Sequence, residues 1–372
     1  MAVTGLRRDL YMDLDTPSLL VDLDIMEANL QSMAELTRAH GVKLRPHIKT
    51  HKSPWIAQRQ IDYGARGITV AKLGEAEVML AAGIDDILLA YPVIGRHKVE
   101  RFAKLLAQAD IKIAIDSVEA ADAASWAARM TGKTVQVYLD VDTGLGRMGR
   151  PWGQPSVELA REIAKRDGVE IMGVLTHAGH LMRAPSEDAL RQASMESAQR
   201  LVDTARLLRE AGIPVREVSP GFTAGARFEA AVPGVTEIRP GTYVFNDANE
   251  VHAWAASVET CAAFVLAQVV SRPAPDRAVI DAGSKTLTQD RSIREDSGHG
   301  IVIGHPEVKS VSLSEEHGVL RVPPESDLAV GDRLLIIPNH ICPVVNLFDV
   351  MYGVRKGAIE REIPVAARGM RQ

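Results

Sequence analysis

The sequence predicts an α/β protein: a (β/α)8 barrel of the TIM type followed by a C-terminal all-β domain. Two observations predict the barrel. Short β-branched runs alternate with helical patterns from residue 18 to about 221, and eight such runs occur. Beyond about residue 250, short strands broken by glycine, proline and aspartate replace this alternation. We therefore expect a barrel over 15–250 and an antiparallel β domain over 251–372, with residues 1–14 as a candidate addition to the latter.

Eight runs supply the expected barrel strands. In order they are SLLVDL, KLRPHIK, GITVAK, DILLAY, KIAID, VQVYLDVD, IMGVLTHA and VREVSPG. Helical stretches separate them, and residues 74–83, for example, end on Gly83, which is typical of a helix stop. An open doubly wound sheet is the alternative, but no GxGxxG follows the first run and the count of eight matches a closed barrel.

Composition excludes several classes of function. Of the 372 residues, 46% are hydrophobic and 24% charged, which is the balance of an ordinary folded protein. Aromatic residues make up 4% and the net charge is −5, so base-stacking surfaces and a basic nucleic-acid footprint are both missing. The N-terminal stretch lacks the apolar core of a signal peptide, and no run approaches the about 18 apolar residues of a membrane span. We expect a cytoplasmic protein without nucleic-acid or membrane partners, and two cysteines are too few for a disulfide framework.

Candidate functional residues cluster at the ends of the expected strands. In a parallel barrel, reactive groups lie at the C-terminal ends of the strands, where the loops meet at one face. Lys49 ends the second run, Arg147 follows the sixth, His177 and His180 end the seventh, and Gly221 follows the eighth. We therefore expect all of them at one mouth of the barrel.

Lys49 lies within RPHIKTHK (45–52), among other cations such as Arg45 and Lys52. Repulsion between like charges favours the neutral amine, which is the form that condenses with an aldehyde. If the aldehyde belongs to a phosphorylated cofactor, a glycine-rich loop should offer N–H groups to the phosphate, and SPGFTAGA (219–226) has that composition. A solvated lysine and an ordinary surface turn are the alternative interpretations.

Six segments, in order, resemble one enzyme family. They are DTPSLLVDL (15–23), RPHIKTHK (45–52), DTGLGRMG (142–149), THAGH (176–180), TEIRPGTYVFND (236–247) and PNHICPVVNLFD (338–349). Together they resemble the fold-type III pyridoxal-phosphate enzymes, and in particular the D-threonine aldolase and D-serine dehydratase group, whose barrel is akin to that of alanine racemase. The resemblance extends over residues 14–368.

The resemblance implies a cofactor site around Lys49. Lys49 would bind pyridoxal phosphate covalently, Arg147 would contact its phenolic oxygen, and His177 would lie against its ring. A helix-capping arginine and a satisfied core histidine are the structural alternatives for Arg147 and His177.

Further residues of this implied site would surround the cofactor. Gly221, Thr223 and Ala224 would hold the phosphate, in a loop, GFTAGA, that departs from the family's usual sequence. Tyr243 would lie near the phosphate or the ring, with a core position as the alternative. Arg239 would contact the pyridine nitrogen, as the matching arginine does in alanine racemases.

NHIC places His340 and Cys342 two residues apart, so on a strand both side chains would face one side and could share one ion. Packing is the alternative for an isolated HxC pair, but the resemblance puts a metal pair here. Imidazole and thiolate favour zinc, with manganese or magnesium as alternatives. Glu316 or His317 would orient the ligands.

The expected function is a pyridoxal-phosphate- and divalent-metal-dependent lyase acting on small β-hydroxy-D-amino acids, in a homodimer. As a D-threonine aldolase, it would use His180 as the acceptor of the hydroxyl proton and would release glycine and an aldehyde. If Lys49 instead removes the Cα proton and the hydroxyl leaves, the enzyme is a D-serine or 3-hydroxy-D-aspartate dehydratase. An amino-acid racemase and a non-catalytic pyridoxal-phosphate carrier are the remaining alternatives.

Overall fold

The computed structural model describes residues 11–294 and 298–372, which form two compact units. The barrel unit comprises residues 32–49, 54–241 and 369–372. The described residues of the sheet unit are 11–31, 50–53 and 242–368. Three segments expected in the barrel domain belong by their contacts to the sheet unit, namely 15–31, 50–53 and 242–250. Residues 369–372, expected in the β domain, belong to the barrel unit, and residues 1–10 of the candidate N-terminal addition lie outside the described residues.

Eight strands surround the core of the barrel unit in the part of the chain that the structure describes. They are β2 (Lys43–Leu44), β3 (Ile68–Val70), β4 (Asp86–Leu89), β5 (Asp110–Ile115), β6 (Val135–Asp142), β8 (Val169–Leu175), β9 (Glu217–Ser219) and β10 (Glu237–Ile238). Strands β3-β4-β5-β6-β8-β9 form a parallel sheet, and β2 pairs with β10. The N–H of Ile48 donates to Thr69 and that of Thr236 to Val218, so the pair joins both edges of the sheet. The predicted fold class is therefore confirmed, since the ring of strands closes.

One of the eight predicted barrel strands is wrong. Ser18–Asp22 (β1) pairs with β11 (Ala263–Ala274) and β17 (Val350–Arg355) in the sheet unit. Its side chains are buried along both faces, which is the pattern of a parallel barrel strand. The missing strand is β10, whose two residues are too few to show a period. The candidates predicted at the barrel mouth still follow the C-terminal ends of strands, each one strand earlier in barrel order than predicted: Lys49, Arg147, His177, His180 and Gly221.

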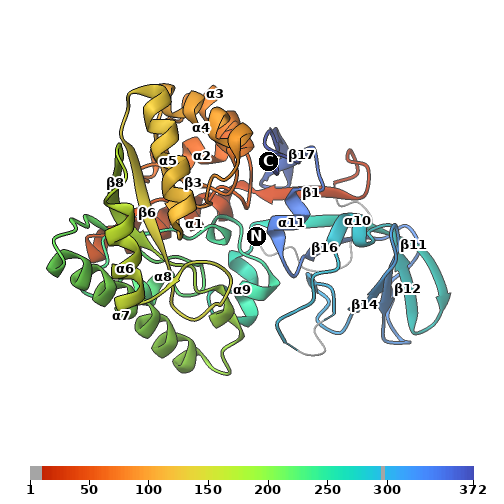
Figure 1. The fold of residues 1–372 in the computed structure, drawn as a ribbon. Coiled ribbons are helices and arrows are strands. Elements are labelled where there is room, and N and C mark those ends of the chain that lie inside the picture. The colour runs from red at the N-terminus through yellow and green to blue at the C-terminus, as the bar shows by residue number, and fades with distance from the viewer. Residues whose placement is uncertain (1–10, 295–297) are drawn as a thin grey trace. The chain divides into compact units, whose positions relative to one another are not determined.

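Helices cover the outside of these strands. They are α1 (Leu23–His40), α2 (Pro54–Asp62), α3 (Leu73–Ala81), α4 (Arg96–Gln108), α5 (Val118–Thr131), α6 (Gln154–Ile163), α7 (Glu187–Glu210) and α8 (Ala226–Glu229). Figure 1 shows α5, α6 and α7 beside β6 and β8; α5 and α6 are in contact with both strands and α7 with β8. Helix α5 begins where the Ser117 side chain accepts from the Ala120 N–H, and it ends at Gly132, whose φ of 69° suits glycine.

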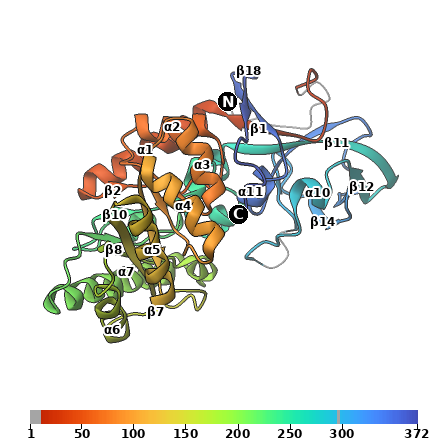
Figure 2. The ribbon, with the colours of Figure 1, turned by 45° about the horizontal axis from the view of Figure 1, so that its top comes forward.

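The sheet unit is mostly β. Its strand order is β14-β15-β12-β11-β1-β17-β18, with β16 on β11 and β13 on β16. The bounds are β12 (Arg277–Ile280), β13 (Ile301–Val302), β14 (Lys309–Leu313), β15 (Gly318–Arg321), β16 (Arg333–Ile337) and β18 (Ala358–Pro364). Its short helices are η2 (Thr242–Val244), α9 (Ala248–His252), η3 (Val258–Thr260), α10 (Ser284–Leu287) and α11 (Ile341–Val345). Figure 2 shows the long strand β11 running from beside β1 towards β12.

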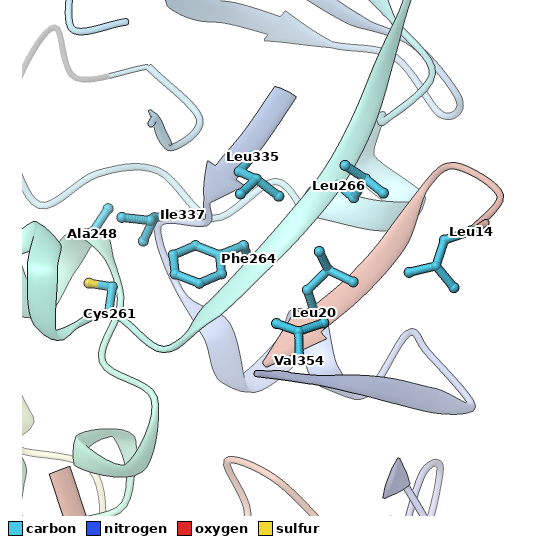
Figure 3. Close-up of a cluster of buried hydrophobic side chains, with 9 residues drawn as sticks. All are labelled: Leu14, Leu20, Ala248, Cys261, Phe264, Leu266, Leu335, Ile337 and Val354. Atoms are coloured by element: carbon cyan, nitrogen blue, oxygen red, sulfur yellow. The ribbon is translucent and has the colours of Figure 1, made fainter. Parts of the chain in front are cut away.

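A cluster of buried side chains forms the core of the sheet unit (Figure 3). Its members are Leu14, Leu20, Ala248, Cys261, Phe264, Leu266, Leu335, Ile337 and Val354. Phe264 and Leu266 of β11, like Leu335 and Ile337 of β16, are two residues apart and therefore share one face of the sheet. Cys261 is fully buried here as a packing residue. No helix in the described chain has the length and apolar character needed to cross a bilayer.

Candidate active site

Lys49 lies just beyond β2, at the C-terminal end of the barrel strands. The main chain is fixed at this point, because the N–H of Ile48 donates to Thr69 at 2.9 Å and that of Lys49 to the Nδ1 of His47 at 3.3 Å. The Lys49 side chain is half-buried, and its charge contributes to a lowered pKa at His177. Lys49 and His177, which come from different strands, therefore lie within electrostatic reach of each other.

Arg45 does not crowd Lys49 as the sequence suggested. Its buried guanidinium pairs with Glu237, at 2.8 Å from Nε, and with Asp86, at 2.6 Å from Nη1. Its charge is thus matched by carboxylates from β10 and β4. Lys52, the other expected neighbour, belongs to the sheet unit.

His177 is held as a neutral imidazole. Burial, and then the charge of Lys49, lower the pKa of His177 to about 3. Its Nδ1 lies 2.9 Å from the carbonyl oxygen of Gly221, and since a carbonyl only accepts, Nδ1 carries the hydrogen and Nε2 a lone pair. A Cβ at Gly179 would lie 2.7 Å from that Nε2, so the ring occupies space that only glycine leaves free.

Arg147 lies on a glycine-rich loop, residues 142–149, that two carboxylates hold. The Oδ1 of Asp142 accepts from the Gly144 N–H at 2.9 Å, and the Oδ2 of Asp116 accepts from the Gly149 N–H at 2.9 Å. Gly149 has a φ of 101°, and a Cβ there would lie 2.8 Å from the Asp142 nitrogen. The loop therefore needs glycine at this position, and its bonds fix the main chain on either side of Arg147.

Asp140 and Asp116 are acidic neighbours of this loop that sequence reasoning missed. Burial raises the pKa of Asp140 to about 6, and the charge of Asp116 adds to this rise. The positive charges of Arg239 and Arg147 oppose it. Asp116 directly follows β5 in KIAID, and Asp140 lies two residues before the end of β6 in VQVYLDVD, so their positions near strand ends were the available signal.

His180 is exposed in the short helix η1 (Gly179–Arg183). A Cβ at Gly144 would lie 3.3 Å from its Nε2, so the imidazole contacts the loop that carries Arg147. Desolvation lowers the pKa of His180 and the charge of Asp142 opposes that shift. The imidazole is therefore neutral near pH 7 and can accept a proton.

The segment Gly221–Ala224 offers free donors. Within residues 11–294 and 298–372, the main-chain N–H groups of Gly221 and Ala224 donate to no protein acceptor, although both residues are buried. Such buried donors need a partner, and an anion supplies one. The Oγ1 of Thr223 accepts from the Gly241 N–H at 3.3 Å, and α8 begins two residues beyond Ala224. This loop after β9 thus fits a phosphate group.

Arg239 is committed to the protein itself. Its Nη2 donates to the carbonyl of Thr176 at 2.7 Å, and its Nη1 donates to the Oγ of Ser219 at 2.7 Å. It therefore ties the end of β8 to the end of β9, which the expected contact with a pyridine nitrogen did not anticipate. Glu229 lies nearby, fully buried, and burial raises its pKa to about 8 against the opposing charge of Arg239.

The sheet unit holds the remaining candidates. Tyr243 is buried in η2, with 4% of its surface exposed. His340 and Cys342 do not lie on a strand as predicted, because His340 is the N-cap of α11 and Cys342 is in its first turn. They still meet, since a hydrogen bond between them is among the causes of the His340 pKa shift.

Every residue from Asn339 to Cys342 is anchored within the sheet unit. Asn339 donates to the carbonyls of Asp290 and Gly298, at 3.0 and 2.9 Å. The Nδ1 of His340 lies 2.8 Å from the Oδ2 of Asp290, and the Ile341 N–H donates to the Oδ2 of Asp247 at 3.1 Å. The histidine and the cysteine are thus preorganised by their surroundings.

Cys342 has two hydroxyl neighbours, because the Oγ1 of Thr50 lies 3.2 Å from its Sγ and that of Thr242 lies 3.8 Å away. Burial lowers the pKa of His340, but the charge of Cys342 and the hydrogen bonds to Cys342 and Asp290 outweigh burial and raise it to about 10. Glu316, expected to orient these ligands, pairs with Lys285 instead, at 2.8 Å. Asp290 is a carboxylate that contacts His340.

The donor set of this pair suits a soft or borderline ion. A thiolate and an imidazole are the ligands of zinc. Among the residues that the structure describes, no group of three or more His, Cys, Asp or Glu side chains is arranged to hold a metal ion. An ion on these two ligands would therefore keep positions open for water or substrate.

Comparison with known proteins places the chain in a family. The model of the alanine racemase N-terminal domain matches residues 21–249, and that of a serine dehydratase domain matches residues 262–354. The chain is 36% identical over 360 residues to D-threonine aldolase of an Arthrobacter species, covering 95% of this chain and 93% of that protein. It is also 36% identical over 353 residues to D-threo-3-hydroxyaspartate dehydratase of Delftia sp. (strain HT23), covering 90% and 93%.

A solved structure agrees. The crystal structure of D-threonine aldolase from Filomicrobium marinum matches with a TM-score of 0.89 at 33% identity, and the match covers 100% of both chains. The chain belongs to the fold-type III pyridoxal-phosphate enzymes that carry an alanine racemase N-terminal domain. Its relatives within that family are lyases, both aldolases and dehydratases.

Proposed function

We propose that the protein is a pyridoxal-phosphate- and divalent-metal-dependent lyase that cleaves β-hydroxy-D-amino acids, with D-threonine split into glycine and acetaldehyde. One observation carries the proposal: Lys49 lies within electrostatic reach of the neutral His177, and His177 is bonded to Gly221 at the start of the free N–H groups. His177 therefore lies near both the amine that would bind the aldehyde, on Lys49, and the N–H groups that would bind the phosphate, which begin at Gly221.

The proposed cofactor residues fit pyridoxal phosphate. Lys49 would bind its aldehyde, and Gly221, Thr223 and Ala224 would bind its phosphate. When bound, the cofactor supplies an electron-accepting ring conjugated to the amino nitrogen of the substrate. Arg147, on the loop that Asp142 and Asp116 hold by hydrogen bonds, would bind the phenolic oxygen. Arg239 would act from a distance, because its terminal nitrogens already bond to Ser219 and Thr176.

Proton handling falls to the histidines and Lys49. His177, neutral at physiological pH, adds no positive charge beside the Lys49 amine and can pack against a ring. His180 would take the proton of the β-hydroxyl, because its imidazole is neutral and exposed to substrate and water. Tyr243 would lie near the phosphate or the ring of the cofactor.

His340 and Cys342 would hold the metal ion, zinc by the chemistry of the donors, with manganese or magnesium as alternatives. The ion would supply Lewis-acid assistance to departure of the hydroxyl proton. The chain itself links the two proposed sites, because Lys49 and Thr50 are consecutive and Thr50 lies against the Cys342 sulfur.

A dehydratase is the second candidate, and Cys342 is the observation that favours it. A thiolate ligand selects zinc, and a zinc-assisted loss of hydroxyl from D-serine or 3-hydroxy-D-aspartate would yield a keto acid and ammonia. The 36% identity to a dehydratase equals that to an aldolase.

Product analysis decides between them. Acetaldehyde and glycine from D-threonine would establish the aldolase, whereas keto acid from D-serine or 3-hydroxy-D-aspartate without aldehyde would establish the dehydratase. Chelator-insensitive racemisation of alanine would identify a racemase. Borohydride reduction of the holoprotein and peptide mapping test the cofactor site, and an unmodified Lys49 would overturn the proposal. Loss of both activities in Lys49→Ala is expected.

We also propose that the enzyme is a cytoplasmic homodimer, as enzymes of this fold type tend to pair head to tail. A mass measurement by light scattering at micromolar concentration tests the dimer, and a monomer would contradict it. Fractionation of the source cells tests the location.

A further inference from the structure

The carboxylate of Asp290 forms a hydrogen bond with His340, which sequence reasoning did not anticipate. The two residues lie 50 positions apart, and the Oδ2 of Asp290 is 2.8 Å from the Nδ1 of His340. An ionised carboxylate only accepts, so Nδ1 carries the hydrogen of this bond. The other ring nitrogen, Nε2, is then the one that can give up its proton and bind an ion, while Nδ1 stays bonded to Asp290.

The main chain of Asp290 is fixed by the residue that precedes His340. Asn339, with 1% of its surface exposed, donates through Nδ2 to the carbonyl of Asp290 at 3.0 Å. The Asp290 N–H donates to the Oγ1 of Thr288 at 3.2 Å. Consecutive residues therefore bind Asp290 in two places: Asn339 binds its main chain, and His340 binds its side chain.

The segment around Asp290 is also fastened to α9. The Ile293 N–H donates to the Oδ1 of Asn249 at 2.9 Å, and the Oγ of Ser292 lies 3.0 Å from the Nδ1 of His252. Helix α9 begins at Asp247, which accepts the Ile341 N–H. The same helix thus supports both partners of the Asp290–His340 bond.

We propose that Asp290 is a positioning residue for the metal ligand His340, which it holds in the Nδ1–H tautomer so that Nε2 faces the ion beside Cys342. This inference rests on the proposed function, because it requires His340 to bind a metal. Partners of this kind change metal affinity by roughly 10- to 100-fold when they are removed. Asp290 acts through His340, so its effect must appear in metal binding before it appears in turnover.

The test measures metal affinity of the chelator-treated full-length protein. Zinc is titrated against a chromophoric chelator, for the parent and for Asp290→Ala, Asp290→Asn, His340→Ala and Cys342→Ala. We expect Asp290→Ala to weaken zinc binding by roughly 10- to 100-fold. Asp290→Asn keeps an oxygen that accepts from Nδ1–H, so it should recover most of the affinity. Unfolding of the metal-free variants is recorded alongside and should match the parent, because both side chains of the bond are nearly half-exposed.

The chain offers a matched control. His305 and Glu307 form a second histidine–carboxylate pair in the same unit, with 3.2 Å between Nδ1 and Oε1. Strands β13 and β16 are antiparallel, with Ile301 opposite Ile337. From Ile301 the chain continues towards His305 alongside β16 in the direction of Arg333, which leads away from His340. Glu307→Ala should therefore leave zinc affinity unchanged.

The outcomes separate the two proposals. Undiminished zinc binding in His340→Ala and Cys342→Ala would overturn the proposed metal site, and the positioning role with it. If those two variants lose zinc but Asp290→Ala binds as tightly as the parent, only the role of Asp290 is wrong. Equal losses in Asp290→Asn and Asp290→Ala would also overturn that role, because the carboxylate would then act by its charge or as a ligand.

Discussion

The hydroxyl of Thr50 lies 3.2 Å from the Sγ of Cys342, and Thr50 follows Lys49 in the chain. Thr242 places a second hydroxyl 3.8 Å from the same sulfur. A thiolate accepts hydrogen bonds from hydroxyl groups, and donors of this kind stabilise the charged form that binds metals. One residue beyond the proposed cofactor lysine, the chain thus supports the proposed metal ligand.

Replacing Thr50 by valine should weaken metal binding. Valine has a similar shape but no hydroxyl, and a hydrogen bond to a charged group contributes about 1.5–3 kcal/mol. We therefore expect zinc affinity to fall by about tenfold or more. Thr50→Ser retains the hydroxyl and serves as the control, and chelator competition measures both. Equal affinities in the valine variant and the parent would show that the hydroxyl does not act on the metal pair.

Gly179→Ala should displace the His177 ring while leaving the histidine itself unchanged. The added Cβ would lie 2.7 Å from Nε2, so the ring must move and strain its 2.9 Å bond to Gly221. We expect weaker pyridoxal-phosphate binding, seen in absorbance titrations, and a kcat reduced by at least about tenfold, since small misplacements at a site are costly. Gly212→Ala, at an open position with a φ of 79°, is the control for general strain. A Gly179→Ala enzyme with parental cofactor affinity and kcat would argue against His177 in the site.

The sequence predicted the architecture well because the barrel repeats one pattern many times. Alternation of strands and helices needs no knowledge of distant contacts. The exception was Ser18–Asp22, where burial on both faces hides which sheet the strand joins. The two-residue β10 had no period to recognise. The strand-end positions of Lys49, Arg147 and His177 were predictable for the same reason as the barrel, since they follow from topology.

Pairings between distant loops could not be predicted. Nothing local relates Asp290 to His340, or Arg45 to Glu237, because the chain between them decides whether they meet. The HxC spacing indicated a shared ion but not the helix start on which His340 and Cys342 lie. Motifs therefore carried the residues that we propose contact cofactor and metal, whereas the groups that hold those residues emerged only from the fold.

Glu229 should make stability depend on pH. Burial raises its pKa from 4.5 in the unfolded chain to about 8 in the folded protein. Between those values the folded state binds the additional proton, so the free energy of unfolding falls as pH rises, by up to about 1.4 kcal/mol per pH unit. Glu229→Gln removes this contribution. Its stability relative to the parent should rise from pH 5 to pH 8 and then level off.

Urea unfolding at several pH values measures this effect. Glu158→Gln, at an exposed position on α6, is the control for the loss of a carboxylate. A constant difference between Glu229→Gln and the parent would mean that Glu229 is ionised in the folded protein throughout.

Asp116→Ala should loosen the loop that presents Arg147. The Oδ2 of Asp116 accepts from the Gly149 N–H at 2.9 Å, and alanine removes that acceptor at the end of β5. We expect about 1–3 kcal/mol of lost stability from the unsatisfied donor, together with weaker pyridoxal-phosphate binding, because Arg147 loses its fixed position. Asp122→Ala is the matched control, since it removes a largely exposed carboxylate that pairs with Arg166 on the barrel unit. Absorbance titration of the cofactor separates the two roles: a stability loss in Asp116→Ala with unchanged cofactor affinity would mean that this bond supports the fold and not the site.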